Sequence, residues 1–200
     1  MSYIFLNLMI VFLGLVVVFP LIRLKWNTGV WGIVIREESG EVENIVRIAT
    51  SLMFLSLLVL SIVVANLDAH ALSFFLPLKK TLPVGIAVSV IGMAIVAVAQ
   101  AQMGASWRIG IDNEPTELCT NGLYSLVRHP IYTGISLCLI GVIFVAPSPW
   151  TLIPVLPGFL LVSLQARLEE QHVRVQHGAA FDDWARRTGR IIPGVGKVKN

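Results

Sequence analysis

Long apolar runs are the feature of this sequence that most limits its fold. Three of them cover residues 3–22, 45–66 and 82–103. Each matches the roughly 20 apolar residues that a helix needs to cross the hydrocarbon core of a membrane. A fourth apolar stretch, 131–164, is longer still. The chain is therefore predicted to be an integral membrane protein built from helices.

The fourth stretch predicts a helical hairpin. The letters APSPW interrupt it, and the two prolines among them disfavour one continuous helix. We expect two antiparallel helices, 131–146 and 150–168, with Pro154 and Pro157 kinking the second. Together with the first three runs, this gives an all-α polytopic protein of about five transmembrane helices. A hairpin that only enters the membrane and returns would leave four.

Composition agrees with a membrane protein and excludes other classes. Hydrophobic residues make up 56% of the 200 residues and charged residues 14%, against about 25% charged in a typical soluble domain. The length predicts one domain. A net charge of +3 is too small to indicate nucleic-acid binding. The two cysteines, Cys119 and Cys138, form no metal-binding spacing, and we expect no metal site.

The basic residues predict the orientation in the membrane. If five helices cross, all Lys and Arg residues except Lys79 and Lys80 fall on one side. The positive-inside rule makes that side cytoplasmic, with the C-terminus inside and the N-terminus outside. Whether the 131–164 stretch crosses the membrane twice or only enters and returns, loop 104–130 and the tail after 164 share this face. A tight hairpin then brings the residues before 131 close to those after 164.

Charged and titratable residues gather at this mouth of the hairpin. Arg128 and His129 precede its first helix, and Arg167, Glu169 and Glu170 lie near the end of its second. Taken alone, Arg128 could reach lipid headgroups, and His129 could be a loop histidine with a backbone partner. Carboxylates near a helix C-terminus oppose the helix dipole, so they need a cationic partner. The residues predict a cytosolic polar pocket with both signs of charge, without naming a reaction.

The segment after 178 predicts a short helix on the cytoplasmic membrane surface. Phe181 and Trp184 lie three positions apart among charged neighbours, as in an amphipathic interfacial helix.

Segment 103–194 resembles the isoprenylcysteine carboxyl methyltransferase family and its relatives, the phospholipid methyltransferases. Four motifs carry the resemblance in order: TELCTNGLYSLVRHPIYTG, RLEE, GAAFDDW and GRIIP. The resemblance implies S-adenosylmethionine as methyl donor and an active site at the cytoplasmic interface of an integral membrane fold. We therefore expect one methyltransferase domain over residues 1–200, with scaffold helices in 1–102 and the cofactor-binding catalytic region in 103–194.

The resemblance also implies roles for the matching residues. Those expected at the cofactor are Thr116, Glu117, Leu118, Cys119, Tyr124, Arg128, His129, Pro130, Ile131, Tyr132, Glu169 and Glu170. Arg167 is expected to meet the carboxylate of the acceptor, although the family position could align with Gln165. His177 stands where the family usually has an aromatic residue.

The chemistry fits these residue types. A sulfonium ion favours nearby carboxylates and aromatic faces, and the carboxylate of the cofactor can pair with Arg128 or His129. We expect a lipophilic acceptor from the bilayer, first an isoprenylcysteine-type carboxylate, which is already ionised and needs no base. A phospholipid amine or a small hydrophobic thiol is the alternative, with His129 as general base. A sterol-reductase-like enzyme with a nicotinamide cofactor and a non-catalytic membrane scaffold are the alternatives of other classes.

Overall fold

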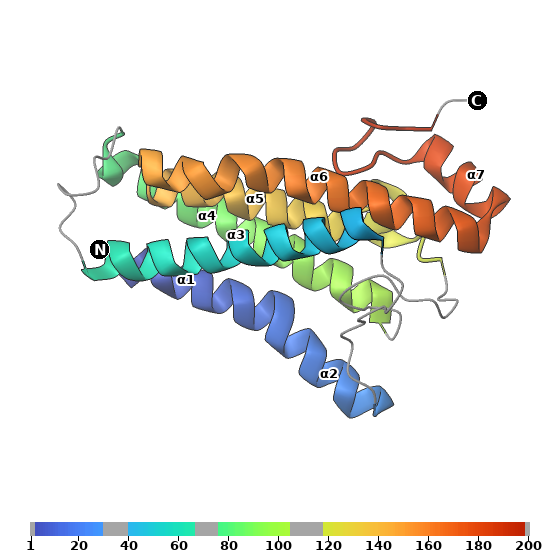
Figure 1. Ribbon diagram of the computed structural model, residues 1–200, viewed down its shortest axis with the longest axis horizontal. Helices are drawn as coiled ribbons and strands as arrows, with labels where there is room; N and C mark the ends of the chain where they lie inside the picture. Colours follow the sequence, from blue (N-terminus) through green and yellow to red (C-terminus); the bar gives the residue numbers. More distant parts are fainter. Residues whose placement is uncertain (1–2, 30–39, 67–75, 105–117, 199–200) are drawn as a thin grey trace.

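The computed structural model describes residues 3–29, 40–66, 76–104 and 118–198, and these form helices joined by turns (Figure 1). In chain order the helices are α1 (Tyr3–Leu13), the π-helical turn η1 (Gly14–Val18), α2 (Phe19–Thr28), α3 (Glu41–Asn66), α4 (Leu78–Met103), the 3₁₀ turn η4 (Gly122–Ser125), α5 (Pro130–Val145), α6 (Pro149–His177) and α7 (Ala179–Arg187). The predicted all-α class is confirmed.

Four helical segments of the described chain are long and apolar enough to cross a membrane. They are Tyr3–Asn27, Glu41–Asn66, Leu78–Met103 and Pro149–His177, and they contain the predicted runs. Helix α5 is apolar but has only 16 residues. The protein is therefore an integral, multi-pass membrane protein.

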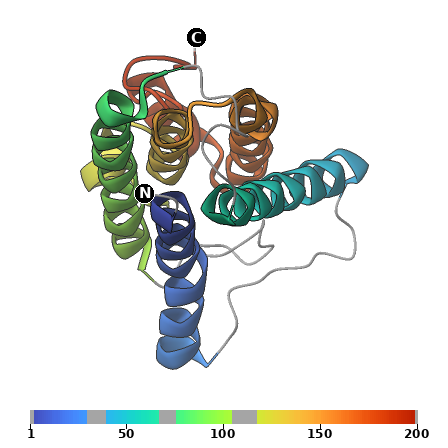
Figure 2. The ribbon, with the colours of Figure 1, turned by 90° about the vertical axis from the view of Figure 1, so that its left-hand side faces the viewer.

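The predicted hairpin is present as α5 and α6. The hydroxyl of Ser148 caps α6 by accepting a hydrogen bond from the N–H of Trp150 at 3.3 Å. Helix α6 then runs for 29 residues and includes Pro154 and Pro157. Figure 2 shows α5 between α4 and α6, while α3 packs on α1 and α6.

Helices α4 and α5 approach each other backbone to backbone. A Cβ atom built on Gly92 would lie 2.6 Å from the carbonyl oxygen of Gly134, and one on Gly134 would lie 2.5 Å from that of Gly92. Such contacts allow close packing of membrane helices and leave no room for a larger side chain. They fix the position of α5, whose first residues belong to the hairpin mouth.

Helix α7 exists as predicted, but its apolar side faces the protein. Phe181 and Trp184 are buried and pack with Ala99 and Tyr124. The indole N–H of Trp184 donates to the carbonyl oxygen of Tyr124 at 2.9 Å. The protein itself therefore covers these two side chains.

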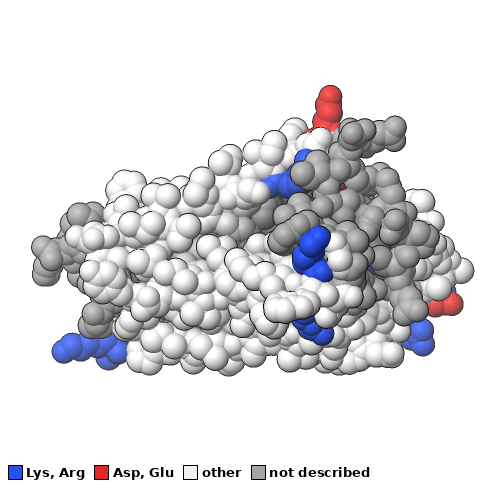
Figure 3. All heavy atoms as spheres, turned by 90° about the horizontal axis from the view of Figure 1, so that it is seen from below, with Lys and Arg blue, Asp and Glu red and all other residues white. Residues whose placement is uncertain are grey.

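Charged residues lie towards the two ends of the helix bundle. Lys79 and Lys80 are in the first turn of α4, at the end opposite to the hairpin mouth (Figure 1). Figure 3 shows an uncharged band between two groups of Lys and Arg side chains. This pattern matches a bundle that crosses the apolar part of a membrane.

Candidate active site

The two ends of the hairpin meet, as the sequence predicts. The hydroxyl of Tyr132 donates to Oε1 of Glu169. His129 lies between the two glutamates: its Nδ1 is 3.5 Å from Oε2 of Glu169, and its Nε2 is 3.5 Å from Oε1 of Glu170. We call His129, Tyr132, Glu169 and Glu170 the mouth cluster. It joins α5 to a part of α6 that lies at least 37 positions later in the chain.

Pro130 sets the direction in which His129 leaves the helix. It begins α5 and is fully buried, and His129 precedes it with φ −125° and ψ 66°, outside the helical region. A residue before proline is disfavoured from the helical conformation, so the helix starts here. The imidazole then stacks on the ring of Tyr132, with 5.5 Å between centroids and 27° between planes. Ile131, also predicted at the cofactor, is half-buried beside the main core.

The C-terminal segment holds the turn before α5 through backbone hydrogen bonds. The N–H of Arg128 donates to the carbonyl oxygen of Gly189 at 2.8 Å, and the N–H of His129 donates to that of Arg190 at 3.0 Å. The N–H of Gly189 in turn donates to the carbonyl oxygen of Leu126 at 3.2 Å. This ladder fixes the backbone that carries His129.

Arg128 lies inside the protein. Only 2% of it is exposed. Its guanidinium donates to Oε1 of Glu170 at 2.6 Å and to the carbonyl oxygens of Thr188 at 2.6 Å, Gly196 at 2.8 Å and Ala185 at 3.1 Å. The alternative that it reaches lipid headgroups is wrong. Its predicted contact with a cofactor carboxylate is not supported either, because protein acceptors occupy the guanidinium.

Glu170 joins two arginines and so differs from its neighbour Glu169. Besides Arg128, it accepts hydrogen bonds from Nε and Nη2 of Arg190, both at 2.8 Å. The side chain of Glu170 is 10% exposed, whereas that of Glu169 is 29% exposed. The geometry makes Glu170 an anchor for the C-terminal segment and leaves Glu169 as the more accessible carboxylate. The sequence motif GRIIP contains Arg190, but sequence reasoning gave this residue no role.

The surroundings of His129 favour its protonated form. Burial lowers the pKa of the imidazole, but the nearby Glu169 and Glu170 raise it by more, so the net pKa is raised. The buried Nε2 lies 3.5 Å from Oε1 of Glu170, so both nitrogens of a protonated ring face a carboxylate. A ring that is already protonated cannot accept a proton, and this opposes the predicted use of His129 as a general base.

The segment before the turn completes one wall. Tyr124 is buried with its hydroxyl 3.5 Å from the carbonyl oxygen of Ala99. Burial raises its pKa, and the nearby Cys119 and Glu169 raise it further, so the phenol stays neutral. Leu118 and Cys119 pack beside Tyr124. The predicted residues Thr116 and Glu117 lie outside the described part of the chain.

Arg167 does not join the mouth cluster. Gln165 and Glu169 are four positions apart and share a face of α6, whereas Arg167, two positions from each, lies on another face. Arg167 is exposed and Gln165 is half-buried. Of the two residues considered for the acceptor, Gln165 is the one placed on the side of Glu169.

Comparison with known proteins decides the family. Residues 81–180, half of the chain, match the model of the phospholipid methyltransferase family. The chain belongs to this family. The matched range contains all of α5 and α6, nearly all of α4, and the whole mouth cluster. The chain is thus a membrane protein of the phospholipid methyltransferase family.

A solved structure supports the fold. This member of the family is similar to the eukaryotic intramembrane Ras methyltransferase, isoprenylcysteine carboxyl methyltransferase, with a TM-score of 0.54 and 20% identity. The similarity covers 83% of this chain and 56% of the methyltransferase chain, so this chain spans little more than half of the length of that protein. A search of curated proteins gave no match.

Proposed function

We propose that the protein transfers a methyl group from S-adenosylmethionine to a lipophilic acceptor at the cytoplasmic face of the membrane. The observation that carries this proposal is the accessible carboxylate of Glu169, held by Tyr132 beside His129 at the hairpin mouth. Family membership supports the reaction class. The cytoplasmic assignment rests on the basic residues, which favour that side for all segments except the one with Lys79 and Lys80.

The described residues fit the positively charged part of the cofactor. S-adenosylmethionine, when bound, supplies an electrophilic methyl group on a sulfonium ion. Glu169, with the rings of Tyr124 and Tyr132 nearby, favours the positive charge.

Catalysis in such a site consists mainly of placement. Methyl transfer is an in-line displacement, and holding the reacting atoms about 3–3.5 Å apart supplies much of the rate gain. Pro130, the backbone ladder to Gly189 and the ion pairs of Glu170 keep the mouth cluster in place. The bilayer delivers the acceptor sideways, so its apolar tail stays in lipid while its reactive head meets the donor.

Two acceptor classes follow from different observations. An isoprenylcysteine-type carboxylate is the first expectation from the sequence, and it requires a cation such as Arg167. A phospholipid amine is favoured by the family match and by the cluster itself, since Arg128 and Arg190 are both paired with Glu170. An amine must lose a proton before it attacks, and Glu169 is the accessible carboxylate that can accept it.

Methyl transfer in liposomes tests the proposal. The full chain is supplied with methyl-labelled cofactor and either phosphatidylethanolamine or a prenylated cysteine, and labelled lipids are identified by mass spectrometry. We expect label in one of the two. Glu169→Gln should lower the rate about tenfold or more, because it removes the charge that faces the sulfonium. The control Asp183→Asn changes an exposed carboxylate on α7 and should keep the rate. No transfer to either acceptor contradicts the proposal.

Arg167→Ala separates the two contacts considered for the acceptor. If Arg167 holds an acceptor carboxylate, this variant raises the KM for the acceptor more than it weakens cofactor binding. An unchanged KM, together with a raised KM in Gln165→Ala, assigns the contact to Gln165.

A further inference from the structure

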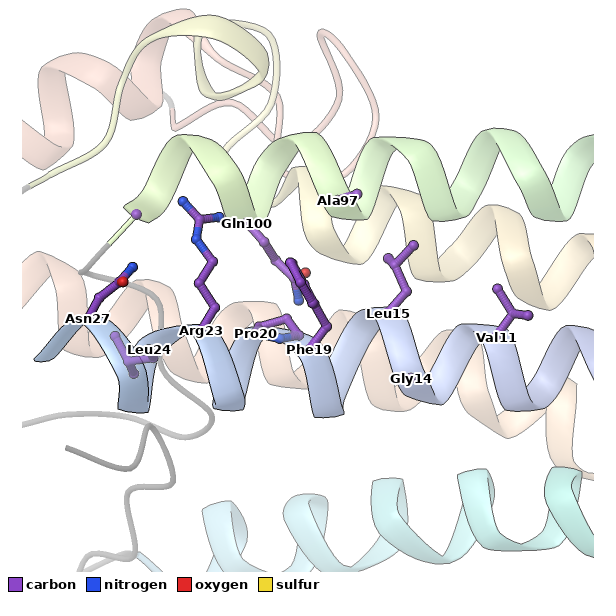
Figure 4. Close-up of a pocket in the computed structure, with 11 residues that line it drawn as sticks. Val11, Gly14, Leu15, Phe19, Pro20, Arg23, Leu24, Asn27, Ala97 and Gln100 are labelled. Atoms are coloured by element: carbon purple, nitrogen blue, oxygen red, sulfur yellow. The ribbon is translucent and has the colours of Figure 1, made fainter. Parts of the chain in front are cut away.

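A cavity of about 520 Å³ lies between the N-terminal helices and α4 (Figure 4). Most of its wall is apolar, with side chains such as Val11, Leu15 and Phe19 on one side and Ala97 on the other. None of its lining residues belongs to the mouth cluster. The cavity is therefore a second candidate binding site with different walls.

Pro20 and the π-helical turn η1 account for the cavity. Proline has no N–H, so Pro20 cannot donate to the carbonyl oxygen of Val16 four positions earlier. The side-chain amide of Gln100, on α4, donates to this oxygen instead at 2.8 Å. A π turn and a proline both bend helices, and Figure 1 shows α2 turning away from the bundle. The space that opens between α2 and α4 is the cavity.

One end of the cavity is polar and positively charged. Figure 4 shows Arg23 and Asn27 near the last turn of α4, and Val11 at the far end. Arg23 is exposed, and within the described chain neither its side chain nor that of Asn27 makes a hydrogen bond or ion pair. Among the described residues, the lining contains this one arginine and no acidic residue.

The length of the apolar part suits one lipid chain. From Val11 to Arg23 the helix rises about 18 Å at about 1.5 Å per residue. One leaflet of a bilayer contributes about 15 Å, half of a hydrocarbon core of about 30 Å. An acyl chain that starts at the level of Arg23 therefore reaches the end of the cavity near the middle of the membrane.

We propose that this cavity binds an anionic phospholipid of the bilayer. Its phosphate lies at Arg23 and Asn27, and one acyl chain lies against Leu15 and Phe19. The charge of the described lining selects the headgroup. An arginine without a described counter-ion attracts an anion, and no carboxylate of the described lining holds the ammonium group of a zwitterionic lipid. The proposal does not depend on the methyl transfer at the mouth cluster.

Native mass spectrometry of the full chain tests the headgroup. The protein is purified in detergent and titrated with phosphatidylglycerol or with phosphatidylcholine of the same acyl chains. We expect tighter retention of phosphatidylglycerol, and Arg23→Gln should weaken it about fivefold. Lys25→Gln is the matched control, because it removes the same charge from the same helix at a residue that does not line the cavity. Equal retention of the two lipids, or equal effects of the two variants, overturns the proposal.

A cavity-filling variant tests the tail. A Cβ atom at Gly14, which lines the cavity, meets nothing within 4 Å, so Gly14→Leu begins in open space and extends into the cavity. We expect this variant to lose phosphatidylglycerol while its thermal unfolding in detergent stays like that of the wild type. Unchanged retention overturns the proposal. Loss of methyl transfer by Gly14→Leu in bilayers without anionic lipid also overturns it, because the cavity then belongs to the methyl acceptor.

Discussion

Replacing Glu170 by glutamine should unfold the C-terminal segment from the hairpin. The wild-type carboxylate accepts a hydrogen bond from Arg128 at 2.6 Å and two from Arg190 at 2.8 Å. The Arg128 side chain is 0% exposed and that of Arg190 is 26% exposed. Loss of the carboxylate charge therefore leaves one guanidinium buried without a counter-ion, while the other can turn to solvent. Breaking such a buried pair costs about 3–5 kcal/mol.

The assay is thermal unfolding in detergent, followed by tryptophan fluorescence. Trp184 is buried in α7, close to Arg128, and reports on this region. A loss of about 3 kcal/mol corresponds to a midpoint about 10 °C lower in a chain of this length. The control Asp183→Asn removes an exposed pair with Arg186 and should stay within about 2 °C of wild type. Equal shifts in the two variants would refute the assignment of Glu170 as the anchor.

The other predictions concern pH and packing. Since the folded-state pKa of His129 is raised, its contribution to stability is full below about pH 6.5 and declines as the pH rises through the folded value. The difference in unfolding midpoint between wild type and His129→Asn should thus shrink from pH 6 towards alkaline pH, and a growing difference would be inconsistent with this. Gly134→Ala should destabilise the fold by about 1–3 kcal/mol because its Cβ meets the backbone of Gly92. Gly14→Ala, whose Cβ meets open space, should leave the stability unchanged. Similar unfolding midpoints for the two variants would argue against the close contact of α4 and α5.

The hairpin and the meeting of its ends could be predicted from the sequence because both depend on local signals. Apolar length and the prolines of APSPW define two helices with a short turn, and an antiparallel pair necessarily brings its outer ends together. This geometry places His129 and Glu169 at the mouth, and the family resemblance adds Tyr132.

The partners of the charged residues could not be predicted in the same way. The pairing of Arg128 with Glu170 and the carbonyl oxygens of the tail depends on where residues 188–196 return to the bundle, and no local pattern specifies this path. The spacing of Phe181 and Trp184 predicts an amphipathic helix, and α7 confirms it. An apolar helix face, however, looks the same in sequence whether lipid or protein covers it, and here protein covers it.

The cavity beside α4 was also beyond sequence reasoning. Its shape depends on a hydrogen bond between Gln100 and Val16, which are 84 positions apart. Pro20 alone, within a predicted span, indicates a bend without giving its direction.

Calorimetry with S-adenosylmethionine tests the central claim most directly. The purified full chain in detergent is titrated with the cofactor and, separately, with NADPH, and the measurements are repeated for Glu169→Gln and Asp183→Asn. We predict binding of S-adenosylmethionine and not of NADPH, about tenfold weaker in Glu169→Gln and unchanged in Asp183→Asn. Wild-type protein that binds no S-adenosylmethionine, or Glu169→Gln that binds it as tightly as wild type, would contradict a cofactor site at the mouth of the hairpin.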